Sequence, residues 1–398
     1  MESDLLYRYP NVLGVLALVA LLYVSLYCLK RRRPDLLEKW NVSLEGPIII
    51  GRTDRFNPLL ERLGEKCSKL AKPLSLISTA VGIYLMYVGV HFIHSNLLAL
   101  LSAEPYATPV SVLIPGISIG PESLPYFIAA LAIAFLPHEL AHGIAASSHG
   151  IPIRSSGLLL AVLVLGGFVE PDEEKLERSP LLAKMGVFTA GSFANFLTFL
   201  ILSTIFLMSM YPSGVLVNET LEGYPASSAL ERMDLITRLN DTKIESLADL
   251  VGFLKRTKPG DVVYVTVERG GRELVMAIRL AEDPRNRSKG FIGAKFSDFY
   301  ELRGVETLGA TLRRALSLEV YKLFLWSTVI CQSFAVINML PIYPFDGGRL
   351  LSALVDRVSK RGGLGSKVKI AATVYFAAIL LANILLSLKI WGIEVWLP

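Results

Sequence analysis

Apolar residues in this chain gather in long blocks that polar and charged stretches separate. A helix needs about 20 predominantly apolar residues to cross the roughly 30 Å hydrocarbon core of a bilayer. The blocks that approach this length lie at about 11–29, 73–101, 124–147, 182–210, 318–341 and 368–391. The pattern therefore predicts a polytopic α-helical membrane protein with about six transmembrane helices.

Composition and charge agree with this class. Of the 398 residues, 52% are hydrophobic and 19% are charged, and the mean hydropathy is +0.49. Such values exclude an ordinary soluble protein of this length. The net charge of +5 does not indicate nucleic acid as a partner, because the basic residues flank the apolar blocks. The cysteines are scattered and predict no disulfide framework: Cys28, Cys67 and Cys331.

Lysine and arginine determine the predicted orientation. Both are frequent at 30–72 and after the third and fifth blocks, whereas the loop 102–123 contains neither. Positive residues mark the cytoplasmic side of a membrane protein. We therefore expect an integral protein of the plasma membrane whose amino terminus lies outside, with membrane lipid around it. The third block then runs from outside to inside.

Two segments depart from the helical pattern. Residues 213–300 have a soluble composition, with a short strand at 214–217, a helix at 247–256, a period-two strand at 262–268 and another strand at 274–280. Gly270–Gly271 is expected to form the hairpin turn between the last two of these segments. The segments predict a small inserted α+β domain, which the topology places outside. Residues 151–169 are apolar but contain three glycines. We interpret them as a membrane-associated hairpin, because irregular backbone at this depth is tolerated against protein or a wet cavity.

The predicted organisation has six parts, each defined by its spans. The first two parts hold one span each, the third holds the third and fourth spans, and the inserted domain follows. The last two parts hold the fifth and the sixth span. Their bounds are 1–72, 73–123, 124–212, 213–300, 301–365 and 366–398.

The third block carries His138-Glu139-Leu140-Ala141-His142. Positions i and i+4 share one face of a helix, so both imidazoles can bind a single zinc ion. Glu139 is the usual general base beside such a metal. Three ionisable groups in one span are costly without a function. The sequence thus predicts a hydrolytic zinc site, with about one Zn²⁺ per chain, inside a membrane helix.

A catalytic zinc also needs a third protein ligand and an open position. Asp346 is the best candidate, since it follows the fifth block in a stretch that Pro341, Pro344 and two glycines interrupt. Its carboxylate would offset part of the charge of the metal. The remaining histidines are expected to serve the membrane interface, the hairpin or the surface rather than the metal: His91, His94 and His149.

Two amides lie in apolar surroundings, Asn195 in the fourth block and Asn338 in the fifth. Either could hold the substrate backbone or the oxyanion of peptide hydrolysis. Hydrogen bonds between helices are the alternative interpretation of both.

A helical substrate must unwind before attack, because its carbonyls are already hydrogen-bonded. The stretch 341–344 and the hairpin could pair with the unwound segment.

These residues resemble the site-2 protease family of intramembrane zinc metalloproteases, over about 124–210 and 317–360. Its HExxH motif appears at 138–142, and its Asn-x-x-Pro-x-x-Pro-Leu-Asp-Gly motif appears with Phe345 in place of Leu. A central Gly-Pro-x-x-Asn-like motif appears at 191–195 with Ser192 in place of Pro. The resemblance implies that the two histidines and the aspartate bind zinc, that the glutamate is catalytic, and that the substrates are transmembrane proteins.

The inserted segment resembles a PDZ domain of the protease-associated type. Its Gly223-Tyr224-Pro225-Ala226 turn and the segment 233–244 carry this similarity, with Asp241 in place of the usual glycine. The resemblance implies a peptide or a substrate ectodomain as the partner. Short stretches at 46–47 and 170–174 are similar to archaeal members of the protease family.

Three functions compete at this point. An intramembrane endopeptidase fits best. A membrane-anchored zinc protease for soluble substrates would need its site in a soluble domain, which the apolar flanks of 138–142 disfavour. A metal transporter or a non-catalytic membrane adaptor with a peptide-binding domain is the third. A transporter should show several polar spans, whereas this chain concentrates its polar groups at one point and retains Glu139.

Overall fold

The computed structural model describes residues 10–104, 106–115, 117–161, 164–284, 286–359 and 364–392. The chain divides into two compact units. One comprises the chain up to Ile201 together with the stretch from Trp326, and the other comprises Leu202–Leu325.

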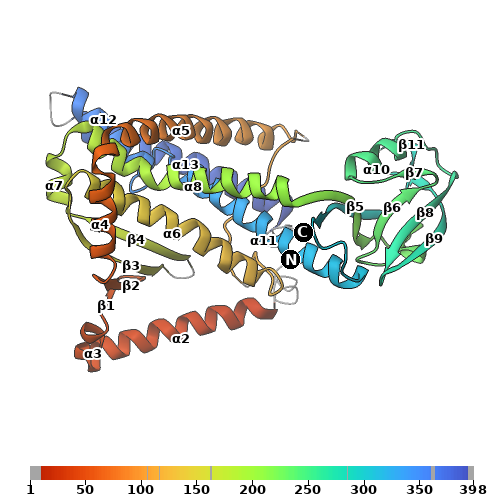
Figure 1. Ribbon diagram of the computed structural model, residues 1–398, viewed down its shortest axis with the longest axis horizontal. Helices are drawn as coiled ribbons and strands as arrows, with labels where there is room; N and C mark the ends of the chain where they lie inside the picture. The colour runs from red at the N-terminus through yellow and green to blue at the C-terminus, as the bar shows by residue number, and fades with distance from the viewer. Residues whose placement is uncertain are drawn as a thin grey trace. The chain divides into compact units, whose positions relative to one another are not determined.

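Long helices dominate the first unit (Figure 1). Helix α2 is followed by a short helix α3, and α4 leads through the turn η1 into α5. Helices α6 and α8 come next, and α11, α12 and α13 complete the set, with the end of α8 and the first part of α11 belonging to the second unit. Their bounds are α2 (Pro10–Arg32), α3 (Pro34–Lys39), α4 (Asn57–Cys67), η1 (Ser68–Leu70), α5 (Ala71–Leu101), α6 (Leu124–Ser148), α7 (Glu173–Arg178), α8 (Leu181–Ser209), α11 (Ala310–Ile337), α12 (Asp346–Val358) and α13 (Leu364–Trp391).

Within the described ranges, five helices are long and apolar enough to cross a membrane, namely α5, α6, α8, α11 and α13. The chain is therefore an integral membrane protein. The predicted first span coincides with α2, and its passage through the membrane stays a prediction.

Helix α13 is held to α5 by a buried amide pair, in which Asn96 Nδ2 donates to Asn383 Oδ1 at 3.0 Å.

The fifth predicted span is shifted along the chain. Helix α11 begins at Ala310 rather than near 318, and it ends at Ile337 rather than at Pro341. Proline disfavours the α conformation of the residue before it, so a helix usually stops ahead of it. Asn338 consequently lies in the turn between α11 and α12 and not within the membrane helix.

The predicted hairpin is present and belongs to a larger sheet. Strands β3 (Ile153–Ala161) and β4 (Val164–Pro171) pair antiparallel, and β3 also pairs with β2 (Ile48–Thr53). Strand β1 (Val42–Glu45) completes the order β1-β2-β3-β4, which leaves β4 at one edge. The sheet lies beside α4 and α6, and β4 contacts α6 (Figure 1). Strands β1 and β2 were not predicted from the sequence.

The second unit contains the inserted domain. The Gly270–Gly271 turn joins β8 and β9 as predicted, with positive φ at both glycines. The sheet has the order β12-β5-β6-β8-β9, with β7 paired to β6, and β10 and β11 form a separate ribbon. The elements are β5 (Met210–Thr220), α9 (Ala226–Ala229), β6 (Leu235–Leu239), β7 (Thr242–Lys243), α10 (Leu247–Leu254), β8 (Val262–Arg269), β9 (Arg272–Arg279), β10 (Ala281–Asp283), β11 (Asn286–Phe291) and β12 (Ala294–Leu302).

A buried apolar core and one ion pair stabilise this domain. Val215, Ile236 and Val265 belong to the core and are fully shielded from solvent. The Asp234 carboxylate, 1% exposed, receives two hydrogen bonds from the Arg269 guanidinium, at 2.7 and 2.6 Å. This pairing raises the pKa of Arg269. A bidentate pair of this kind fixes the geometry of both side chains.

Candidate metal centre

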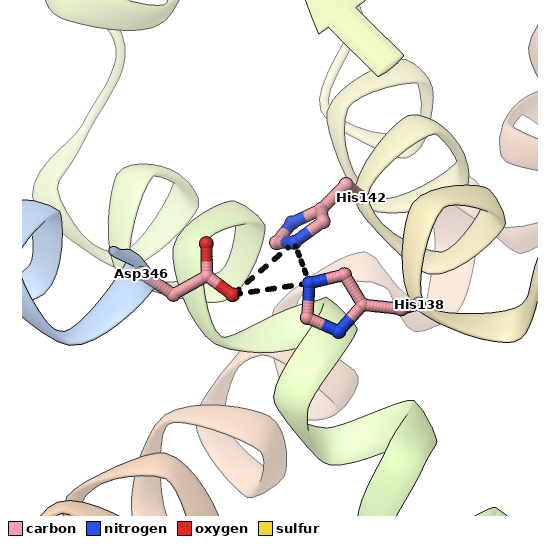
Figure 2. A group of neighbouring side chains, drawn as sticks. All are labelled: His138, His142 and Asp346. Carbon is pink, nitrogen blue, oxygen red and sulfur yellow. Dashed lines mark hydrogen bonds and ion pairs between the residues drawn. The ribbon is translucent and has the colours of Figure 1, made fainter. Parts of the chain in front are cut away.

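Two histidines of α6 form one side of the centre. His138 and His142 stand one helical turn apart, and their Nε2 atoms lie 3.1 Å from each other (Figure 2). His138 is buried and His142 is largely buried. Two imidazole nitrogens at this distance point toward a shared position rather than toward separate partners.

The third side comes from the start of α12. Asp346 Oδ2 lies 3.4 Å from His138 Nε2 and 3.3 Å from His142 Nε2 (Figure 2). This oxygen is buried and has no hydrogen-bond partner in the part of the chain that the structure describes. Burying a carboxylate oxygen without a hydrogen bond is costly. A cation between the three atoms would remove that cost.

The turn before α12 determines where Asp346 lies. The amide N–H of Gly347 donates to the carbonyl oxygen of Asn338 at 2.7 Å, which closes the turn. A Cβ atom at Gly347 would lie 2.1 Å from the Met339 carbonyl oxygen, so only glycine permits this approach. The proline- and glycine-rich sequence after α11 thus brings the carboxylate back against α6.

The dimensions of the donor triangle fit zinc. Ligands about 2.0–2.1 Å from a tetrahedral zinc ion lie roughly 3.3 Å from one another. The observed separations are 3.1, 3.3 and 3.4 Å. Two neutral imidazoles and a carboxylate are ligands that zinc accepts, and three protein donors leave a fourth position open. The three side chains therefore form a group that could hold a catalytic zinc ion.

Helix α8 contacts the ring of His142 on the side away from the triangle. His142 Nδ1 lies 2.7 Å from the carbonyl oxygen of Val187. A carbonyl oxygen can only accept, so Nδ1 must carry the proton and donate it. The lone pair of this imidazole is then on Nε2, which faces the triangle. This hydrogen bond fixes the tautomer that metal binding requires.

One residue of α8 provides space for the centre. A Cβ atom at Gly191 would lie 2.4 Å from His142 Nε2 and 2.6 Å from His138 Nε2. Only glycine allows α8 to pass this close to both ring nitrogens. In the sequence, Gly191 stands out only as part of the motif at 191–195, and Val187 has no signal.

Glu139 lies between the histidines in sequence and faces the sheet. Its Oε2 accepts a hydrogen bond from the backbone N–H of Val169 in β4, at 2.9 Å. The predicted hairpin thus lies directly beside the predicted catalytic glutamate. Val169 is a second contact that the sequence did not indicate, because a backbone N–H has no side-chain signature.

The two predicted amides have different surroundings. Asn195, also on α8, is 0% exposed, and its side-chain Nδ2 lies 3.1 Å from His138 Nδ1. Asn338 is half-buried, and its carbonyl oxygen belongs to the turn that positions Asp346. Outside the centre, His94 contacts Val90 and Tyr375, and His149 contacts Ser75.

Three side chains that could hold a metal ion, two of them beside a glutamate on the membrane-length helix α6, are the arrangement expected of a membrane metallohydrolase. The sequence profile of peptidase family M50 matches residues 126–382, which include every predicted site residue. The chain belongs to this family, the site-2 protease family of zinc metalloproteases.

Similar proteins come from archaea, bacteria and plants. An uncharacterized protein of Methanocaldococcus jannaschii is 27% identical over 354 residues, 87% of each chain. The zinc metalloprotease RasP of Geobacillus kaustophilus is 24% identical over 51% of this chain and 56% of its own length. The membrane metalloprotease ARASP of Arabidopsis thaliana is 26% identical over 67% of this chain and 78% of its own length.

Among solved structures, the PDZ domain of an SdrC-like protein from Listeria monocytogenes is similar to 21% of this chain. The similarity covers 87% of that domain at 26% identity, with a TM-score of 0.20.

Proposed function

We propose that this protein is an intramembrane zinc metalloendopeptidase that hydrolyses peptide bonds within or near transmembrane segments of membrane proteins. The donor triangle of His138, His142 and Asp346 is the observation that carries the proposal. Two of its three members lie on α6, a helix long and apolar enough to cross a membrane. Chemistry at this position acts on substrates that enter the bilayer.

Each residue of the centre has a role in this proposal. His138, His142 and Asp346 are the zinc ligands, with about one zinc ion per chain. A bound zinc ion would polarise the scissile carbonyl and lower the pKa of a water molecule to about 7. Glu139 accepts the proton of that water and delivers it to the leaving nitrogen. Asn338, half-buried beside the turn, is the candidate for holding the substrate backbone.

The edge of the sheet offers a place for the unwound substrate. Strand β4 is an edge strand of the described sheet, because it pairs with β3 alone. The N–H of Val169 in this strand points to α6 and donates a hydrogen bond to Glu139. An extended peptide can add to a free sheet edge through main-chain hydrogen bonds. Pairing along the rest of this edge would hold an unwound segment next to the general base. It would also supply hydrogen bonds that the segment loses when its helix opens.

We further propose that the inserted domain lies outside the cell and acts as a size filter or docking site. The distribution of lysine and arginine supports the external side, and the plasma membrane is the expected location. The PDZ-like sequence motif supports a peptide or a substrate ectodomain as the partner. The metal ligands all lie in the other unit, so the domain contributes none of them.

The alternative functions have less support. A transporter needs a pathway of polar groups across several spans, and Glu139 would have no task in it. A non-catalytic adaptor has no need for a buried carboxylate oxygen that faces two imidazole nitrogens and has no hydrogen-bond partner among the described residues, as in Asp346. A protease for soluble substrates would need its ligands outside membrane-length helices.

The test is proteolysis in reconstituted bilayers. The full chain and its Glu139→Gln variant are placed in vesicles with a single-span substrate, and product is followed over time. The amide is nearly isosteric but cannot take a proton from water, so cleavage should stop while zinc is retained. Glu173→Gln, an exposed acid of α7, is the matched control. Cleavage by Glu139→Gln near the wild-type rate would contradict the proposal.

A further inference from the structure

The side chain of Asn195 touches the metal centre from behind. It projects from α8, is 0% exposed, and its Nδ2 lies 3.1 Å from His138 Nδ1. Its Oδ1 is also buried and lacks a hydrogen-bond partner among the described residues. A buried amide oxygen without a hydrogen-bond donor is costly.

The chemistry of His138 decides which end of the amide belongs at the ring. His138 Nε2 faces Asp346 and His142, so a metal ion there takes its lone pair from Nε2. The proton of the neutral imidazole is then on Nδ1, which becomes a donor. The Nδ2 group of an amide is also a donor, and two donors cannot bond each other. The two ends of an amide are told apart by their partners. A half-turn of the Asn195 amide presents Oδ1 to Nδ1–H and gives this oxygen a donor.

We propose that Asn195 is a positioning residue, whose amide oxygen accepts the Nδ1 proton of His138 and orients this imidazole for zinc. The inference rests on the zinc site of the proposed function but not on proteolysis. It assigns to Asn195 a role different from the substrate or oxyanion contact expected from the sequence.

His142 provides an independent parallel. Its Nδ1 meets the Val187 carbonyl oxygen, also on α8, at 2.7 Å. Val187, Gly191 and Asn195 follow at intervals of four, so they share one face of this helix. On this face, the Val187 carbonyl oxygen is an acceptor at one end and Asn195 Oδ1 is an acceptor at the other. Gly191 lies between them and has no side chain. One stripe of α8 therefore supplies the outer hydrogen bond of each histidine and leaves space for their metal-facing nitrogens.

Geometry opposes a role in the oxyanion hole. A donor for an oxyanion has to face the scissile carbonyl, on the metal side of the imidazole. Asn195 contacts Nδ1, whereas the metal side of His138 is Nε2. The amide is also closed off from solvent and from any incoming chain. It can act on the reaction only through His138.

Two substitutions separate the acceptor from the donor. Asn195→Asp keeps an acceptor for Nδ1–H and loses the N–H donor, whereas Asn195→Leu has a similar volume and loses both. If the amide oxygen positions His138, Asn195→Leu should weaken zinc binding by about 10- to 100-fold, and Asn195→Asp should bind close to wild type. Ser192→Ala is the matched control, because Ser192 is a fully buried polar residue of the same helix without a partner among the described atoms.

The measurement is zinc affinity of the purified full chain, by competition with a chelator, together with the visible absorption of the Co²⁺-substituted protein. The Leu variant should also show altered cobalt bands, because one imidazole is misplaced. Unchanged zinc affinity in Asn195→Leu would overturn the assignment, and so would equal weakening in both variants, since shape rather than the acceptor would then matter. If the wild type itself bound no zinc, the proposed function would fail, which is a separate outcome.

Discussion

A methyl group added at Gly191 would enter the space in which the two imidazoles meet. The ideal Cβ atom would lie 2.4 Å from His142 Nε2, 2.6 Å from His138 Nε2 and 2.7 Å from His138 Cδ2. Atoms that are not bonded to each other prefer separations of roughly 3.5 Å. In Gly191→Ala, the rings or the backbone of α8 must therefore move by about 1 Å.

Such a shift exceeds what a zinc site tolerates, because ligand distances hold within about 0.2 Å. We expect zinc affinity to fall by at least about 100-fold, the upper end of the effect of disturbing a ligand's supporting contacts. The metal-free fold should suffer less. Alanine favours a helix over glycine by about 1 kcal/mol, and crowding a packed interior costs about 1–3 kcal/mol. The net change in the free energy of unfolding should stay within about 2 kcal/mol.

Chelator competition and thermal unfolding with and without zinc would measure both quantities. Gly14→Ala is the matched control, since a Cβ there would meet nothing within 4 Å. Zinc affinity of Gly191→Ala equal to that of the wild type and of Gly14→Ala would refute the reasoning. So would a loss of stability in metal-free protein large enough to explain the loss of zinc by unfolding.

Three further predictions concern separate parts of the molecule. Asp346→Ala should lose most of the zinc, as measured by metal analysis, and full metal content in a His138→Ala, His142→Ala double variant would contradict the ligand assignment. Asp234→Ala should destabilise the inserted domain by about 3 kcal/mol, because it leaves Arg269 without its buried partner. Glu231→Ala, at the exposed end of the same network, should cost under about 1 kcal/mol, and hydrogen exchange of β6 and β8 would compare the two. Replacing 213–300 by a flexible linker should preserve zinc binding and cleavage of a short substrate helix, while substrates with bulky ectodomains are no longer excluded. If the deletion variant binds zinc but cleaves neither kind of substrate, the domain is needed to assemble the site.

The sequence could predict the site residues that share one helix face, and the one that follows the proline-rich stretch after a span. His138 and His142 share a helix face whatever surrounds them, so their joint orientation needs no tertiary information. Asp346 could be nominated because an acid beside a span is unusual. That it comes within 3.4 Å of both imidazoles depends on the turn that Gly347 closes, which only the structure displays.

The supporting contacts could not be predicted in this way. The Val187 carbonyl and the Val169 N–H belong to the backbone, which carries no residue signature at either position. Asn195 was singled out for its polarity, but its partner depends on how α8 packs against α6. Strands β1 and β2 were missed because their short hairpin is stabilised by pairing with β3, far along the chain.

The position of the cleaved bond tests the central claim most directly. The full chain is reconstituted with a single-span substrate that carries soluble segments on both sides, and the products are identified by mass spectrometry. Glu139→Gln serves as the inactive reference. A metal centre built on a membrane-length helix predicts a cut within or next to the apolar segment, absent with Glu139→Gln. Cuts confined to the soluble segments would contradict intramembrane proteolysis and favour a membrane-anchored protease of soluble substrates.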